Sequence, residues 1–320
     1  MTLDQMARNF LINVTWSKGV FQLDQPPLTN IKVPPIVKSE TNNWGILIAF
    51  SIIGIWGGSL VLLLSLDISN IHIVTLLPVI FWQTFLCTGL FITAHDAMHG
   101  VVFPQDHKIN NFVGSLALFI YGLLSYKNLL KKHWLHHHNP ASEVDPDFHD
   151  GKNQNFVAWY VHFMKGYWSW TQIIGLMIIF NTLKYALHIP NDNLLLFWVI
   201  PPILSSVQLF YFGTFLAHKE PEGGYSNPHR AQTSPRAVFW SFITCYHFGY
   251  HEEHHEYPRV PWWKLPAVYQ EGVRSQESVG ILVRVENESW SKAASKPQNK
   301  LIYSSILRPY PKHNSGFTES

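Results

Sequence analysis

Four long stretches of this chain are apolar and almost free of charge, and they decide what it can fold into. The first two are Trp44–Leu66 and Ile71–Ala94, and the later two are Trp168–Ile189 and Leu194–Ala217. Lys184 is the one charged residue within them. At about 1.5 Å per residue, roughly 20 helical residues cross the hydrocarbon layer of a bilayer. The sequence therefore predicts four membrane-spanning helices.

The segments between these stretches predict the topology. Asp67–Asn70 and Pro190–Asn193 are short turns without Lys or Arg, so the four spans are expected to form two hairpins. The basic residues lie on the other side, which the positive-inside rule places in the cytoplasm together with both termini. Phe112–Leu124 is apolar but too short to span, and it predicts a re-entrant or interfacial helix.

The composition agrees with a membrane protein. Charged residues make up 14% of the chain, against about 25% in an ordinary soluble domain. A formal net charge of +2 provides no basic field for nucleic acid, two cysteines exclude a disulfide framework, and the N-terminus lacks the pattern of a cleaved leader. We expect a polar, partly flexible lead-in at 1–43, a catalytic membrane domain at 44–270, and a C-terminal cytoplasmic segment with a partly flexible tail at 271–320.

Nine histidines lie at the ends of the apolar stretches or in the polar segments that follow them. Spacings of three and four residues bring side chains together on a helix. Since one transition metal rarely takes more than six ligands, so many converging imidazoles indicate two metals in a cytoplasmic, histidine-rich cap. Ionisable residues at the membrane edge usually serve function. The predicted metal ligands are His95, His99, His133, His136, His137, His218, His251, His254 and His255.

Acidic residues are interleaved with these histidines. Carboxylates often accept the second N–H of a ligand imidazole and so fix its tautomer and orientation. We expect that role, rather than direct metal binding, for these acids. His138 follows the second cluster but points off its ligand face, and we expect it to be a bystander. The candidate supporting acids are Asp96, Asp145, Asp147, Glu252, Glu253 and Glu256.

Three classes of protein compete at this point. Two histidine-bound metals beside a membrane favour oxygen chemistry on an apolar substrate. A zinc-dependent membrane hydrolase is the second class, but catalytic zinc usually takes three protein ligands, so nine imidazoles exceed the need of two zincs. A metal transporter is the third, but transporters bind near the bilayer midplane, and these apolar spans have almost no polar interior.

The residues around the histidines resemble the membrane fatty-acid desaturase/hydroxylase superfamily, and within it the bacterial carotenoid 4-ketolases. The resemblance covers roughly residues 45–270. Its matching stretches are HDAMHG from His95, HWLHH from His133, DPDFH from Asp145, FGTFLAH from Phe212 and HFGYHEEHHEYP from His247. The histidine boxes alone specify the superfamily, and the flanking residues point to the ketolases.

This resemblance implies an all-α integral membrane enzyme with two non-haem irons, O2 as co-substrate and an external electron donor such as ferredoxin. It implies β-carotene or a related carotenoid as substrate, hydroxylated twice at C4 of the β-ionone ring. The geminal diol then loses water, giving echinenone and then canthaxanthin. A carotenoid 3-hydroxylase or an acyl-lipid desaturase would keep the same fold and metals, and is the nearest alternative. We also expect an apolar tunnel lined by the first and fourth spans, the short helix, and aromatics near Trp240 and Phe248.

Overall fold

The computed structural model describes residues 14–17, 20–23 and 43–274. Met1–Lys38 and Ser39–Ser320 form two separate compact units. In the first unit, β1 (Val14–Ser17) and β2 (Val20–Leu23) form an antiparallel hairpin, which the sequence analysis did not predict. Most of the predicted lead-in at 1–43 and of the predicted C-terminal segment at 271–320, both expected to be partly flexible, lies outside the described residues. The three-part division of the chain stays a prediction.

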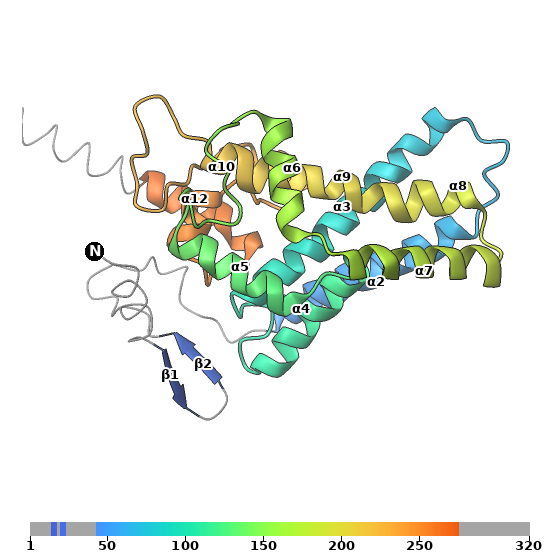
Figure 1. The fold of residues 1–320 in the computed structure, drawn as a ribbon, viewed down its shortest axis with the longest axis horizontal. Helices are drawn as coiled ribbons and strands as arrows, with labels where there is room; N and C mark the ends of the chain where they lie inside the picture. The colour runs from blue at the N-terminus through green and yellow to red at the C-terminus, as the bar shows by residue number, and fades with distance from the viewer. Residues whose placement is uncertain (1–13, 18–19, 24–42, 275–320) are drawn as a thin grey trace, which may run out of the picture. The chain divides into compact units, whose positions relative to one another are not determined.

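The second unit is built from helices, and its long helices lie side by side (Figure 1). α2 (Trp44–Leu64) and α3 (Ile73–Met98) form a hairpin whose buried side chains meet along its length. The His72 imidazole caps α3 by accepting the Val74 N–H at 3.3 Å. Apolar residues dominate both helices on all faces, as expected of helices surrounded by lipid and other helices.

α4 (His107–Gly122) and α5 (Tyr126–His138) follow, bent by 103° at a short break. Leu123 ends α4 in the left-handed conformation, and the Ser125 hydroxyl starts α5 by accepting the Asn128 N–H. α4 packs on α3. The predicted re-entrant or interfacial helix at 112–124 corresponds to α4 as far as Gly122, with its last two residues in the bend, and α5 turns away to carry the second histidine cluster.

α6 (Phe156–Tyr167) and α7 (Trp170–Ala186) lead to one continuous helix, Asn191–His218. This helix consists of α8 (Asn191–Leu194), α9 (Ile200–Phe210) and α10 (Leu216–His218), joined by π-helical turns at Leu195–Val199 and Tyr211–Phe215. Proline lacks an N–H and its ring clashes with the carbonyl four residues earlier, so Pro201-Pro202 accounts for the first wide turn.

The last described helices are short. They are α11 (Val238–Cys245), α12 (His251–Glu256), a 3₁₀ turn at Trp262–Lys264, and a helical stretch at 265–274. α11 contacts both α3 and α9. α12 carries the third histidine cluster.

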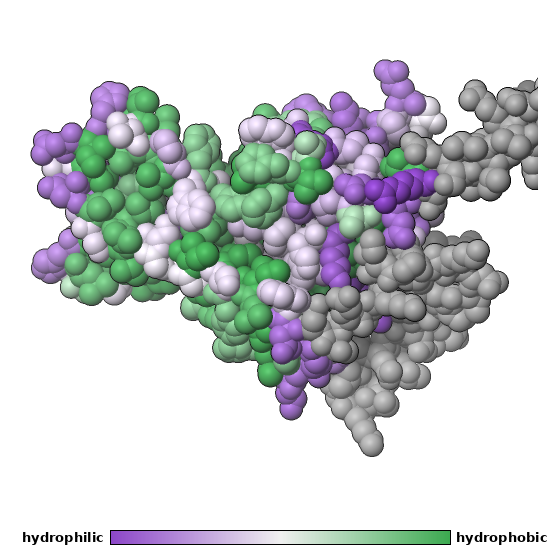
Figure 2. All heavy atoms as spheres, turned by 180° about the vertical axis from the view of Figure 1, so that it is seen from behind, coloured by the Kyte–Doolittle hydropathy of each residue, from purple (hydrophilic) through white to green (hydrophobic). Residues whose placement is uncertain are grey.

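Among the described residues, three helices are long and apolar enough to cross a membrane: α2, α3 and Asn191–His218. The bent α4–α5 pair would be a fourth if it counted as one span. The predicted third span becomes α7, which has 17 residues and no buried side chain. Figure 2 shows apolar surface over the long helices, with polar side chains toward both ends. The prediction of a helical, multi-pass membrane protein is confirmed in these coarse terms, with the β1–β2 hairpin as the exception to an all-α fold.

Candidate metal centre

Four separate helices of the second unit bring the nine predicted histidines together. α3 carries His95 and ends at His99, α5 carries the second cluster, α10 ends at His218, and α12 carries the third cluster. Most of these side chains are buried. Their ring nitrogens fall into two groups of four, and within each group one nitrogen per residue lies within 4.8 Å of the others. The first group is His95, His99, His133 and His254; the second is His136, His218, His251 and His255.

Each histidine cluster on α5 and α12 divides between the two groups. On α5, His133 joins the first group and His136 the second. On α12, His254 joins the first group, whereas His251 and His255, one helical turn apart, join the second. On a helix, a side chain three residues further along points about 60° to one side of the first, and a side chain four residues along points about 40° to the other side. A single short helix can therefore present histidines to two neighbouring groups.

His137 lies against both groups without belonging to either set of four. Its Nε2 is 3.0 Å from the Nε2 of His254, and its ring stacks on that of His255 with centroids 4.2 Å apart. The structure thus brings all nine predicted histidines into one cluster.

The arrangement of these histidines fits metal ions. Two ligands each about 2.1 Å from a metal, at angles of 90° to 109°, are about 3.0 to 3.4 Å apart. The Nε2 atoms of His136 and His255, and those of His255 and His251, are 3.1 Å apart. The Nε2 atoms of His95 and His218 are buried without a hydrogen-bond partner. A buried polar atom without a partner is costly, and coordination to a metal would remove that cost.

The state of the imidazoles also suits metal binding. Burial and the neighbouring imidazoles hold the pKa values of His254 and His255 well below the usual range. These rings are therefore neutral at physiological pH and keep a lone pair for a metal.

Asp145 orients one member of the second group. Its carboxylate accepts the Nδ1–H of His136 at 2.9 and 3.0 Å, and it also accepts the backbone N–H groups of Ala141 (2.8 Å) and Asp147 (2.9 Å). With Nδ1 carrying the proton, Nε2 of His136 presents its lone pair to the group. Asp145 thus makes the contact that a supporting role would need, and the role itself stays a prediction.

The other acids differ in how close they come. Asp96 lies 3.8 Å from Nδ1 of His95 and accepts the Trp262 N–H. Among the described residues, no hydrogen bond joins Glu252, Glu253 or Glu256 to a ligand histidine, and Glu253 instead accepts the Thr233 hydroxyl. Their supporting role stays a prediction without a contact behind it.

Asp147 takes part in a polar contact that the sequence analysis did not anticipate. Its carboxylate accepts the Tyr167 hydroxyl, and the Lys132 ammonium lies 4.4 Å from the centre of the Tyr167 ring. Burial raises the pKa of Asp147 to about 6. Asp147, Asp145 and His136 also lie close enough to share a cation.

His218 is oriented by the backbone. The carbonyl oxygen of Arg230 accepts the Nδ1–H of His218 at 2.8 Å, so Nε2 faces the second group. The sequence could not predict this acceptor, because every residue has a main-chain carbonyl and nothing in the residue types marks this one. His138 is exposed, as expected of a bystander, and its Nδ1 contacts the Trp134 carbonyl of its own helix.

A large apolar cavity of about 910 Å³ begins at the histidines. His95, His133, His136 and His251 line one end, and the wall follows the helix Asn191–His218 from Thr214 back to Leu195. The nineteen helical steps from Leu195 to Thr214 correspond to about 28 Å. The cavity is therefore long enough for an extended apolar molecule with one end at the histidines.

The predicted tunnel is partly right. Phe248 lines the cavity and packs edge-on against the rings of His95 and His251, at 4.9 and 5.3 Å between centroids. Trp240 does not line it and is exposed on α11. The predicted tunnel did not include α6 and α7, which both line the cavity, because the sequence analysis assigned no helix to 156–167 and could not tell which face of α7 points inward.

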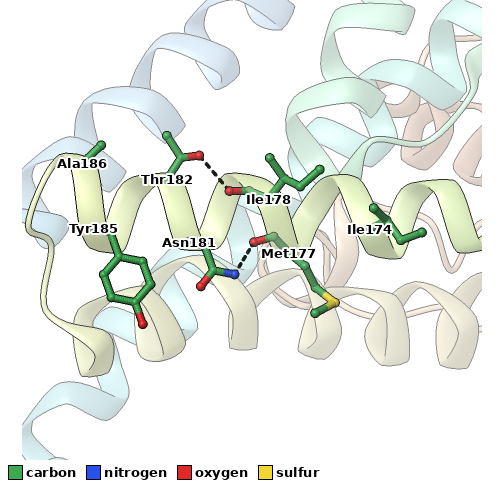
Figure 3. Close-up of a pocket in the computed structure, with 7 residues that line it drawn as sticks. All are labelled: Ile174, Met177, Ile178, Asn181, Thr182, Tyr185 and Ala186. Atoms are coloured by element: carbon green, nitrogen blue, oxygen red, sulfur yellow. Dashed lines mark hydrogen bonds between the residues drawn. The ribbon is translucent and has the colours of Figure 1, made fainter.

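The outer face of α7 is a shallow apolar surface (Figure 3). Two polar side chains there, Asn181 and Thr182, donate hydrogen bonds to the carbonyls of Met177 and Ile178 on their own helix. Polar groups satisfied within one helix are what a lipid-facing surface requires. α7 therefore separates the cavity from the surroundings.

Known proteins share this sequence pattern. The family model described as fatty acid desaturase matches residues 69–187 and 168–279. The chain is 38% identical to zeaxanthin 4-ketolase of Chlamydomonas reinhardtii, over 78% of this chain and 55% of that protein. It is 44% identical to β-carotene 4-ketolase 3 of Haematococcus lacustris, over 57% and 58%. It is 40% identical to β-carotene ketolase of Paracoccus sp. (strain PC1), over 60% and 78%. The chain thus matches little more than half the length of the two algal relatives.

Proposed function

The chain belongs to the fatty acid desaturase family, and from this premise we propose that it is a carotenoid 4-ketolase acting on β-carotene. The observation that carries the proposal is the position of the histidines. Two groups of four imidazoles lie together, and members of both groups line one end of an apolar cavity about 28 Å long. The related ketolases of Paracoccus and the two algae supply the substrate class.

The ligand set follows from the two groups. We assign His95, His99, His133 and His254 to one metal and His136, His218, His251 and His255 to the other, with His137 beside both. When bound, two irons would supply the activation of O2, with electrons from an external donor such as ferredoxin. Asp145 and the Arg230 carbonyl hold the rings of His136 and His218 in the orientation that binding needs.

The cavity determines how the substrate meets the site. Its apolar wall takes up the polyene from the bilayer and excludes water from the reacting carbon. Phe248, between the rings of His95 and His251, limits how far the terminal ring can advance. Held there, C4 is hydroxylated twice and the geminal diol loses water, giving echinenone. A second round at the other ring gives canthaxanthin.

We further propose four spans in two hairpins, α2 with α3 and α7 with Asn191–His218. Both histidine groups and both termini then lie on the cytoplasmic side. The support is that His95 and His218 stand at the same ends of their helices, together with the basic residues in the segments that follow. Reporter fusions after residues 68 and 191, compared with fusions at the C-terminus, test this orientation.

Expression in a host that makes β-carotene tests the reaction. The proposal expects echinenone and canthaxanthin to form at the expense of β-carotene, with dependence on O2 and reductant and with two irons per purified chain. Formation of 3-hydroxylated carotenoids instead would identify a hydroxylase of the same family. Unchanged β-carotene, with two zincs and no need for O2, would favour a hydrolase.

A further inference from the structure

Residues 234–250, just before the third histidine cluster, run alongside α3 and α9. The two ends of this segment pair with each other near the histidines: the Ser234 N–H donates to the Gly249 carbonyl, and the Tyr250 hydroxyl donates to the Arg236 carbonyl. Between these ends lie α11 and a tight return. Tyr246 and His247 make that return in the left-handed conformation, with φ of 47° and 62°.

The far end of this segment lies well along α3 and α9. The Tyr246 ring stacks on Phe85 with centroids 4.4 Å apart, and the Gln208 side-chain amide donates to the Thr244 carbonyl. Phe85 precedes His95 by ten residues, and Gln208 precedes His218 by ten residues. Ten helical residues rise about 15 Å, so the return lies about that far beyond the histidines, toward the opposite ends of the spans.

Glycines in the spans make room for this return. A Cβ on Gly89 would lie 2.6 Å from the Tyr246 hydroxyl, and a Cβ on Gly213 would lie 1.9 Å from a ring atom of Phe248. No side chain fits at either position without displacing the return. The inner face of the segment is therefore packed against α3 and α9 at the depth of their apolar residues.

The outer face of α11 is apolar and open. Phe239 is 63% exposed and Trp240 59%, with Val238 and Ile243 also exposed, and α11 contains no charged residue. The Trp82 ring stacks on Phe85, and Phe85 meets Phe242 of α11 edge-on. These rings connect α11 to α3, where Phe81 is 63% exposed. The surface of α11 thus continues the exposed surface of a membrane-spanning helix.

We propose that residues 237–250 are a re-entrant membrane segment and that the outer face of α11 contacts lipid acyl chains. If α3 and Asn191–His218 cross the bilayer, a segment packed about 15 Å along them lies in the bilayer too. An uncharged aromatic and aliphatic face fits acyl chains, whereas an electron-donor protein would be expected to meet charged and polar groups. This inference rests on the membrane spans and not on the proposed reaction.

Nitroxide scanning of the full-length protein in phospholipid vesicles tests the proposal. A spin label on Phe239→Cys is compared with labels on Phe81→Cys, exposed on α3, and on Glu222→Cys, in an exposed loop. The natural cysteines, Cys87 and Cys245, are buried, and labelling of the unsubstituted protein measures their background. Each label is scored by its relaxation with O2, which concentrates among acyl chains, and with a water-soluble nickel chelate.

The proposal expects the label at 239 to behave like that at 81, with strong relaxation by O2 and weak relaxation by nickel. A label at 239 that behaves like that at 222 would overturn it, because the face would then lie in water. Protection from both reagents would also overturn it, since a protein partner or a second copy would then cover the face. Ile243→Cys, on the same face, provides the same readout if Phe239→Cys does not accumulate.

Discussion

Replacement of Asp145 by Asn is the sharpest test of how the second histidine group is held. The two carboxylate oxygens each accept His136, and one also accepts the Asp147 N–H while the other accepts the Ala141 N–H. Asn supplies one oxygen and one NH2 in the same space. Whichever way the amide is turned, its NH2 faces a backbone N–H, and the negative charge that held the Nδ1 proton of His136 is lost.

The size of the effect follows from this geometry. Loss of a hydrogen-bonded carboxylate behind a ligand histidine typically lowers metal affinity or activity by about 10- to 100-fold, or about 1.4 to 2.8 kcal/mol. Because only the second group contains His136, we expect the metal count of Asp145→Asn to fall from two toward one per chain. Metal analysis of the purified protein, with a competitive chelator to rank affinity, measures this, and ketocarotenoid yield follows it.

Asp150→Asn is the matched control. Asp150 is exposed, lies five residues away, and accepts only the backbone N–H groups of Lys152 and Asn153. It should keep both metals and full activity. If Asp145→Asn also kept both metals with unchanged affinity, the carboxylate would not orient His136 and the reasoning would be wrong.

Three further predictions concern the metals and the cavity. Alanine in place of His133 should lower ketone formation more than 100-fold while the protein still inserts in membranes. Alanine in place of the exposed His138 should change product yield less than twofold. Equal yields from the two variants would show that the ligand assignment is wrong. Trp in place of Leu176, which lines the cavity, should reduce conversion of β-carotene at least tenfold while both metals are retained. Trp in place of Ile178, which lies two residues further along and faces outward, should leave conversion unchanged. Equal activity of the two variants would argue against this cavity as the substrate site. Removal of the metals with a chelator should lower the thermal unfolding temperature measured in detergent, because metal binding and folding are linked at sites assembled from distant segments, and restored metal should restore it; an unchanged unfolding temperature would contradict that linkage.

The parts of the fold that the sequence predicted are those encoded locally. Uncharged stretches long enough to span a membrane predicted α2, α3 and Asn191–His218. The bilayer sets the length and the apolar composition of such helices, whatever neighbours they pack against. The histidines could be predicted as one cluster because their places at the ends of these helices bring them to one side of the membrane.

The histidine groups, the cavity wall and the position of α11 depend on how the helices pack against one another. The division of the α5 histidines between the two groups depends on the positions of α3 and α12, which the spacing along α5 does not reveal. The role of α6 as a cavity wall depends on Tyr160 and Phe163 facing α9. The packing of α11 and the turn after it along α3 and α9 depends on Gly89 and Gly213. In the sequence these two look like ordinary glycines of an apolar stretch.

The cavity has its histidines at one end only, and this has a kinetic consequence for a substrate with two identical ends. A rod-like molecule held lengthwise presents one terminal ring to the site and buries the other near Leu195 and Trp198. It cannot turn around inside, so oxidation of the second ring requires release, reorientation in the bilayer and a second binding event. Under the proposed function the reaction is then distributive, and the singly oxidised product passes through the lipid as a free pool. Other enzymes of the same membrane can draw on that pool, and the ratio of singly to doubly oxidised product will depend on the ratio of enzyme to substrate.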